Sequence, residues 1–97
     1  MSKYRYAAKI DKNQPEIVNA LRNIPGVSVQ VGMDDIIVGY KKRSYWFEIK
    51  EPETVSKKTG EVMASKIKPS QHKLLETWTG HYSVVWNIDQ ILAEIMA

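Results

Sequence analysis

Hydrophobic positions follow a helical period in some stretches of this chain and a strand period in others, which divides the sequence into elements. Residues 13–26 carry apolar side chains on one helical face, between the start signal Asn-Gln-Pro-Glu and the stop signal Pro-Gly. Residues 27–31 alternate valine with polar residues, which predicts a half-buried strand. Residues 35–40 and 44–50 are two further apolar runs, and the basic turn between them predicts a hairpin.

The second half of the chain continues with one loop, two helices and one strand. Residues 51–68 mix charges with Pro, Thr, Ser and Gly, which predicts a loop without regular structure that overhangs the end of the hairpin. A helix is predicted from near Ser70, a strand over residues 82–86, and a last helix after a capping box formed by Asn87 and Gln90. The apolar residues expected to face the core from the middle helix are Leu74, Leu75 and Trp78, and Trp46 and Trp86 are also spaced like core residues.

This order of elements predicts an α/β fold with a mixed central sheet flanked by helices. The first three strands are expected to be antiparallel neighbours, and the fourth follows a helical crossover, so it can run parallel to one of them. Residues 1–10 have weak periodicity and are compatible with a short strand or an arm. We expect residues 1–97 to form a single domain.

Composition narrows the class of protein. The chain has 97 residues, of which 43% are hydrophobic and 26% charged, as in one small globular domain. At this size the core leaves little margin of stability, so part of it could come from a dimer interface. There is no cysteine, which excludes disulfides and thiolate metal sites. The sequence contains no run of about 18 apolar residues and no apolar signal-peptide core, so we expect a cytoplasmic protein with no membrane contact.

Positive charge is concentrated in one segment. Residues 41–73 contain nine basic and four acidic side chains, a net charge of +5, while the whole chain carries +3. A basic segment of this kind favours a polyanionic partner, most simply nucleic acid, although each lysine alone is equally compatible with a solvated loop. The candidate nucleic-acid-binding residues are Lys41, Lys42, Arg43, Lys57, Lys58, Lys66, Lys68 and Lys73.

The predicted hairpin brings acidic and basic side chains to one place. Side chains alternate across a strand, so Glu48 and Lys50 share a face. A turn centred near Lys42 places Asp35 opposite Glu48 or one step from it, with Cβ atoms about 4.5–5.5 Å apart. Two carboxylates and a lysine suit a phosphodiesterase site that uses Mg²⁺ or Mn²⁺, with the Ile49 carbonyl as a third protein ligand. Lysine guarding a sheet edge is the alternative interpretation of Lys50.

The pattern Asp35, twelve residues, Glu48-x-Lys50 resembles the PD-(D/E)xK, restriction-endonuclease-like nucleases, whose core has the order α-β-β-β-α-β. Over roughly residues 5–95 the chain more specifically resembles the virus-type replication-repair nucleases (VRR-NUC) of small phages and prophages. The matching stretches are residues 11–18, 21–22, 35–39, 47–50, 68–71 before a helix bearing Trp78, and 84–85.

The resemblance assigns roles to further residues and suggests a substrate. It implies that Glu16 faces the metal through water and that Gln71 lies beside Lys50, whereas local pattern alone is compatible with Glu16 as a capping residue and Gln71 as an ordinary first-turn residue. Asp34 stands where the family usually has proline; its side chain is expected to point away from that of Asp35, which we favour as the ligand. The family's stand-alone members imply a homodimer that cuts branched DNA, such as four-way junctions, in phage replication, recombination or repair.

Two other functions stay open from the sequence. One is a non-catalytic nucleic-acid-binding module that keeps the nuclease fold, and the other is a subunit whose cleavage is gated by a partner. His72 and His81 have no partner pattern, so we interpret both as surface or packing residues and not as ligands.

Overall fold

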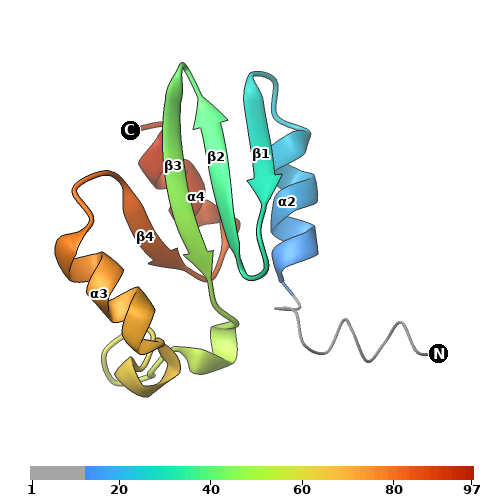
Figure 1. Cartoon of the computed structure of the whole chain (residues 1–97). Coiled ribbons are helices and arrows are strands. Elements are labelled where there is room, and N and C mark those ends of the chain that lie inside the picture. Colours follow the sequence, from blue (N-terminus) through green and yellow to red (C-terminus); the bar gives the residue numbers. More distant parts are fainter. Residues whose placement is uncertain (1–12) are drawn as a thin grey trace.

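A four-stranded mixed sheet organises the structure, a computed structural model that describes residues 13–97 (Figure 1). Its strands are β1 (Val27–Val31), β2 (Asp35–Tyr40), β3 (Arg43–Ile49) and β4 (Tyr82–Val85), in that spatial order. The first three pair antiparallel, and β4 pairs parallel to β3 after the crossover through helix α3 (Pro69–Thr77). The predicted α/β class and mixed sheet are therefore confirmed. The strand or arm predicted at residues 1–10 lies outside the described residues.

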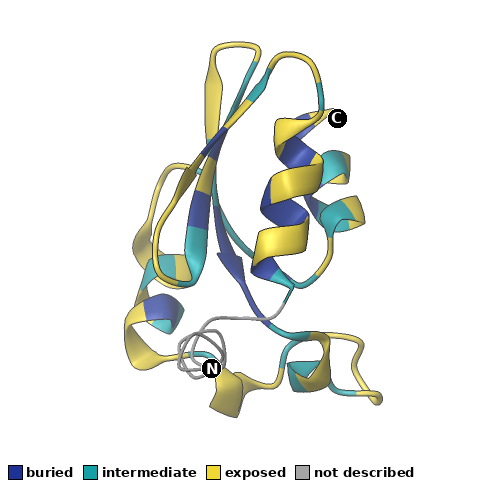
Figure 2. Ribbon diagram, turned by 90° about the vertical axis from the view of Figure 1, so that its right-hand side faces the viewer, coloured by how far each residue is buried: buried dark blue, intermediate teal, exposed yellow. Residues whose placement is uncertain are grey.

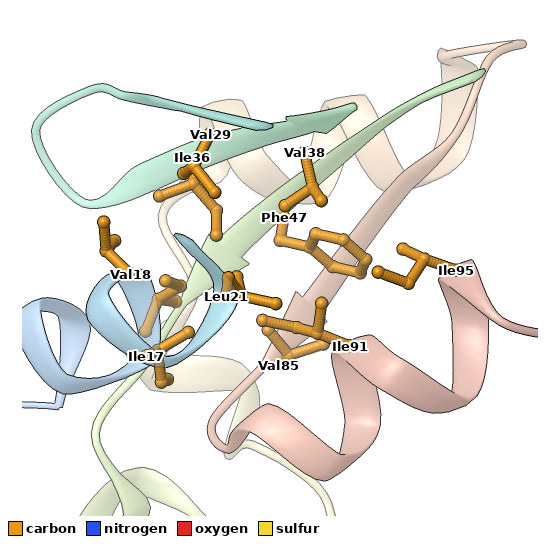
Figure 3. Close-up of a cluster of buried hydrophobic side chains, with 11 residues drawn as sticks. Ile17, Val18, Leu21, Val29, Ile36, Val38, Phe47, Val85, Ile91 and Ile95 are labelled. Carbon is orange, nitrogen blue, oxygen red and sulfur yellow. The ribbon is translucent and has the colours of Figure 1, made fainter. Parts of the chain in front are cut away.

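Helices α2 (Gln14–Arg22) and α4 (Ile88–Ile95) pack on one face of the sheet and form the core with it (Figures 2 and 3). Alternation along the strands sends Ile36, Val38 and Phe47 to this face, where Leu21 and Ile91 meet them. All five are at most 1% exposed. Complete burial of such a side chain contributes about 1.5–3 kcal/mol, so this layer supplies most of the hydrophobic stabilisation.

The two terminal helices start in different ways. Helix α4 begins with the predicted capping box, because the Gln90 amide donates to Asn87 Oδ1 at 2.9 Å and the Asn87 amide donates to Gln90 Oε1 at 3.1 Å. Asn13 occupies the N-cap position of α2, as the start signal predicts, but its side chain makes no capping hydrogen bond. The Asn13 Nδ2 group instead donates to the carbonyls of Lys50 and Trp86, both at 3.0 Å, and so fastens the start of α2 to the ends of β3 and β4.

Helix α3 lies beside β4, away from α2 and α4 (Figure 1). It covers only part of the second face of the sheet, so its apolar side chains are not core residues. Leu75 is 45% exposed and Trp78 is 51% exposed, and Leu74 is half-buried. Trp46 and Trp86 are half-buried as well. The predicted core positions of the three tryptophans and of the α3 leucines are therefore wrong, because helical and strand periods do not tell a complete layer from a partial one.

The segment 51–68 is more ordered than predicted. It contains two short 3₁₀ helices, Pro52–Thr54 and Ala64–Lys66, and an isolated antiparallel bridge between Val55 and Val62. Gly60 closes the turn between these valines with a φ of +73°, a conformation that glycine adopts without a steric penalty. The predicted loop is thus an ordered connection between β3 and α3, because this local pairing satisfies backbone groups that a structureless segment would leave to water.

The open edge of the sheet at β1 is partly covered. Among residues 13–97, β1 pairs on one side only, with β2. The Arg22 guanidinium donates to the Val29 carbonyl at 3.0 Å, so a side chain of α2 occupies a backbone acceptor of this edge strand. No helix within residues 13–97 is long and apolar enough to cross a membrane.

The β2–β3 connection is a two-residue turn in which both residues are lysines. Tyr40 and Arg43 form the last register pair, and Lys41 and Lys42 between them have φ angles of 52° and 66°. Positive φ at both positions suits the right-handed twist of a hairpin but is unfavourable for residues with a Cβ atom. These basic residues lie at the end of the hairpin opposite to Asp35 and Glu48.

We expect Lys42→Gly to stabilise the protein by about 0.5–1 kcal/mol, because relief of the left-handed conformation exceeds the added entropy of the unfolded chain. Lys73→Gly is the matched control, since the same change inside exposed helix α3 should cost about 1 kcal/mol. Urea unfolding of both variants checks the two signs, and a loss of stability in both would contradict the strained turn.

Candidate active site

The register of the hairpin places two predicted site residues directly opposite each other. Asp35, the first residue of β2, pairs with Glu48 near the end of β3. Because directly paired side chains point to the same side of an antiparallel sheet, both carboxylates lie on the face that α2 and α4 do not cover. The predicted register is confirmed, while the role of the two residues as metal ligands stays a prediction.

Glu48 is held in an unfavourable environment for a negative charge. It is 4% exposed, its Oε2 atom has no hydrogen-bond partner, and Tyr82 donates to Oε1 across 3.4 Å. Burial, followed by the negative charge of Asp34, raises the pKa of Glu48 from 4.5 to about 8, against a smaller opposing effect of Lys50. At neutral pH this carboxyl group is therefore mostly protonated in the metal-free protein.

Asp34 is a close neighbour of Glu48 that the strand pattern did not favour. It belongs to the turn before β2, which the hydrogen bond from the Gly32 amide to the Asp35 carbonyl closes at 2.8 Å. Strand alternation does not govern a turn residue, so the Asp34 side chain reaches Glu48 instead of pointing away from it. Its Oδ2 atom also lies 3.9 Å from Lys68 Nζ. The expectation that only Asp35 turns toward Glu48 is therefore wrong.

The Asp35 carboxylate is fixed on both sides. Its Oδ2 atom accepts a hydrogen bond from Trp46 Nε1 at 2.9 Å. Its Oδ1 atom lies against Gly32, where any Cβ atom would collide with it. Glycine at position 32 is therefore required for this orientation of the carboxylate, a constraint of space that the sequence pattern alone did not reveal.

Lys50 follows directly after β3 and is 8% exposed. Its backbone is anchored by hydrogen bonds to the Val85 carbonyl and from the Asn13 side chain, at 2.9 and 3.0 Å. Its positive charge acts on Glu48, whose pKa it lowers. The amide of Ile49 donates to the Asp34 carbonyl at 2.9 Å, which joins this part of β3 to the turn; the predicted use of the Ile49 carbonyl as a ligand stays untested.

Two residues suggested by the family resemblance, Glu16 and Gln71, lie on helices α2 and α3. Glu16 is exposed and lines a cavity with Ala20 and Trp86, and within residues 13–97 no hydrogen bond or ion pair joins it to the acidic residues. Gln71 is buried, and its Oε1 atom accepts the Lys68 amide at 3.0 Å, as an ordinary first-turn residue would. The functional roles predicted for both stay untested.

Three buried oxygen atoms have no partner in the described part of the chain: Asn13 Oδ1, Gln14 Oε1 and Glu48 Oε2. An orphaned acceptor in a protein interior normally binds an ordered water or a cation. Carboxylate and amide oxygens are the donor set that Mg²⁺ and Mn²⁺ prefer. Residues 13–97 contain no group of three acidic, histidine or cysteine side chains arranged as a metal site, so a cation here would need waters or backbone carbonyls as further ligands.

The predicted nucleic-acid-binding residues form two separate groups. Lys41, Lys42 and Arg43 lie at the far end of the hairpin, and Arg43 is five residues from Glu48 along β3, about 17 Å at the usual strand rise. Lys57, Lys58, Lys66, Lys68 and Lys73 are exposed on the segment and helix that follow Lys50. Of these, Lys68 extends to Asp34.

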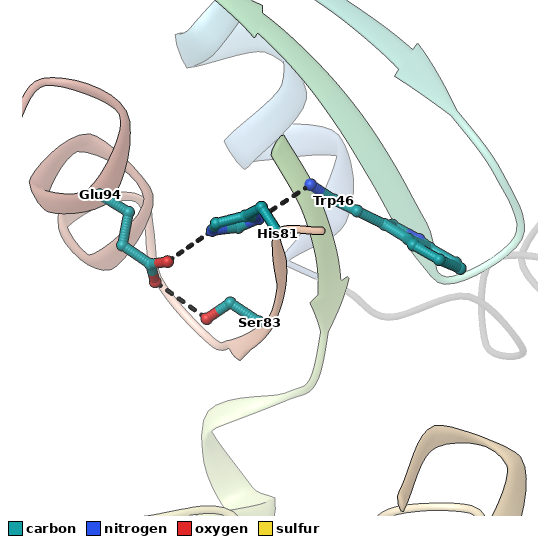
Figure 4. A network of polar contacts seen from close by, with 4 residues as sticks. All are labelled: Trp46, His81, Ser83 and Glu94. Atoms are coloured by element: carbon teal, nitrogen blue, oxygen red, sulfur yellow. Dashed lines mark hydrogen bonds and ion pairs between the residues drawn. The ribbon is translucent and has the colours of Figure 1, made fainter. Parts of the chain in front are cut away.

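His81 has a network of partners that its sequence position did not indicate (Figure 4). Its Nδ1 atom accepts the Trp46 amide at 3.1 Å, so Nε2 carries the proton toward Glu94 Oε1 at 2.7 Å. Ser83 Oγ donates to the other oxygen of Glu94 at 2.9 Å. The network extends the pairing of β3 with β4 and fastens α4 to the sheet, in agreement with the packing role predicted for this histidine.

Comparison of the chain with models of known protein families, with curated proteins and with solved structures finds no significant match.

We expect Glu48→Gln to be more stable than the natural protein at pH 8 in the absence of divalent cations, and the difference to disappear toward pH 5. The folded state retains a proton on Glu48 up to about pH 8, whereas the unfolded chain releases it near 4.5. Folding stability from this group is therefore present at low pH and falls as pH rises between these values, by at most about 1.4 kcal/mol per pH unit.

Thermal unfolding at pH 5 and pH 8 in a chelating buffer measures this effect. Glu53→Gln, at an exposed position, is the control and should change the unfolding midpoint equally little at both values. A Glu48→Gln variant that is less stable at pH 8 would show that the ionised carboxylate has stabilising partners.

Proposed function

We propose that this protein is a divalent-metal-dependent DNA endonuclease of the VRR-NUC type within the restriction-endonuclease-like nucleases. The observation that carries the proposal is the buried Glu48 opposite Asp35 and in contact with Asp34, with the cationic Lys50 two residues further along the chain. Burying a carboxylate without a full set of partners is costly, and proteins tolerate such a group mainly where it has a function.

The side chains fit a hard divalent cation. Asp35 and Glu48 would hold Mg²⁺ or Mn²⁺, with waters or backbone carbonyls as the further ligands. The ion when bound supplies charge neutralisation at the scissile phosphate and a more acidic water. Glu48 would give up its proton on binding, since ligands must be deprotonated. The ammonium group of Lys50 would contact a phosphate oxygen or orient the attacking water, and so stabilise the negative charge that develops during hydrolysis.

The proposed substrate is branched or structured DNA, with four-way junctions as the first candidate, and the proposed assembly is a homodimer in the cytoplasm of a bacterium that carries a phage or prophage. These points rest on the resemblance to the junction-resolving members of the family. The exposed lysines of residues 57–73 support contact with a phosphate backbone, which positions a protein without reading base sequence.

A nucleic-acid-binding module without cleavage activity is the second candidate. It is favoured by the position of Lys41, Lys42 and Arg43, which form a basic end of the hairpin remote from the acidic residues. Such a module has no use for a bound divalent cation, and Mn²⁺ titration calorimetry therefore separates it from the nuclease.

We expect the purified protein to cut a four-way junction only with Mg²⁺ or Mn²⁺, and Glu48→Gln and Lys50→Ala each to lower the cleavage rate by about 10²-fold or more. Glu53→Gln and Lys42→Ala are the controls: the first should leave the rate unchanged, and the second should at most weaken DNA binding. Single-turnover cleavage of a labelled junction measures these rates. Cleavage that survives both Glu48→Gln and Lys50→Ala would remove these residues from the active site.

A further inference from the structure

Three aromatic side chains cluster on the face of the sheet that carries the acidic residues. Trp46 of β3 and Tyr82 of β4 are register partners with ring centres 4.8 Å apart at an interplanar angle of 71°. Trp78, which follows α3, meets Trp46 edge-on at 5.4 Å and 87°. Edge-to-face geometry is the favourable arrangement for aromatic pairs, so each ring restricts the orientation of its neighbour.

The polar atoms of this aromatic trio (Trp46, Trp78 and Tyr82) are directed at the two carboxylates. Trp46 Nε1 donates to Asp35 Oδ2 at 2.9 Å, and the Tyr82 hydroxyl donates to Glu48 Oε1 across 3.4 Å. Each donor thus occupies one oxygen of one carboxylate. The other oxygens are Asp35 Oδ1, held against Gly32, and Glu48 Oε2, which is buried without a partner.

A purely structural role does not explain this arrangement. Trp46 and Tyr82 are outside the buried core, and Trp78 is about half exposed. Buried indole N–H and phenol O–H groups usually find hydrogen-bond partners, but packing does not dictate that both partners are acids facing each other across neighbouring strands. Carboxylates that bind metal ions are commonly fixed by hydrogen bonds from neighbouring groups, and loss of such a partner typically costs 10–100-fold in affinity.

We infer that Trp46 and Tyr82 are positioning residues that orient Asp35 and Glu48 for a divalent cation, and that Trp78 holds the Trp46 ring in place. This inference rests on the proposed function, because it takes the two acids to be the metal ligands. It assigns to the indole and phenol groups the task of fixing one oxygen of each carboxylate, so that the orientation of the other oxygen is set before a cation binds.

The test is Mn²⁺ binding to the metal-free full chain by titration calorimetry, without DNA. Trp46→Phe keeps an aromatic ring but removes the N–H donor, and we expect it to weaken Mn²⁺ binding by about tenfold or more. Tyr82→Phe should have a smaller effect in the same direction, because its hydrogen bond is 3.4 Å long and not 2.9 Å. Trp86→Phe is the matched control and should bind Mn²⁺ as the natural protein does.

A second measurement follows the tryptophan side chains by nuclear magnetic resonance, first without metal and then with Mg²⁺. The indole N–H groups of the three tryptophans give three signals in a nitrogen–proton correlation spectrum, and Trp→Phe variants assign them. Asp35→Asn should move the Trp46 signal and leave the Trp86 signal in place. Diamagnetic Mg²⁺ should likewise shift the Trp46 signal first. The same spectra show whether each variant is folded.

The possible outcomes distinguish a failure of the positioning role from a failure of the proposed function. Unchanged Mn²⁺ affinity in both Trp46→Phe and Tyr82→Phe would overturn the positioning role and leave the proposed nuclease intact. An equal loss in Trp86→Phe would also overturn it, since the effect would then be a general one of aromatic packing. Absence of Mn²⁺ binding by the natural protein would overturn this inference together with the proposed function.

Discussion

The antiparallel register of β2 and β3 is the constraint on which the rest of the structure depends. A two-residue turn at Lys41 and Lys42 leaves only one pairing of the strands, in which Asp35 meets Glu48. A slip of one residue would exchange the faces of a strand, expose Ile36 or Phe47, and move the acid into the apolar layer. Core packing and the juxtaposition of the acids are therefore selected together, and the strained turn is tolerated because it holds both.

The two faces of the sheet have different roles: one packs the apolar core, and the other carries the candidate active site. One face is sealed by α2 and α4 over side chains such as Phe47 and Ile91, where nearly all surface is apolar. The other face carries acids, a lysine and three rings under the partial cover of α3. Burial of Glu48 on this second face disfavours its charge, and the firm apolar layer beneath makes that local cost tolerable.

Local sequence signals predicted most of the fold. The errors share one physical origin, because each concerns a contact between residues that are distant in the sequence or a position that periodicity does not define. Strand alternation located β1 to β4, and the capping box of Asn87 and Gln90 lies entirely within four residues, so both were predictable. The position of Asn13 at the start of α2 was predictable, but the partners of its side chain were not, because they lie 37 and 73 residues away in the chain. Periodicity could not tell that α3 covers only one edge of the sheet, nor that Asp34 sits in a turn. The opposition of Asp35 and Glu48 followed from turn length, whereas the aromatic donors beside them depend on tertiary contacts.

The contact between Arg22 and the Val29 carbonyl has a consequence for how copies of this protein can meet. A sheet whose outer strand offers free backbone acceptors invites lateral growth, and β1 has neither proline nor a charged residue within it to discourage this. An incoming strand would first have to displace the guanidinium from that carbonyl. Replacing Arg22 by a residue without a donor would remove this obstacle to edge-to-edge pairing of β1 with a second copy.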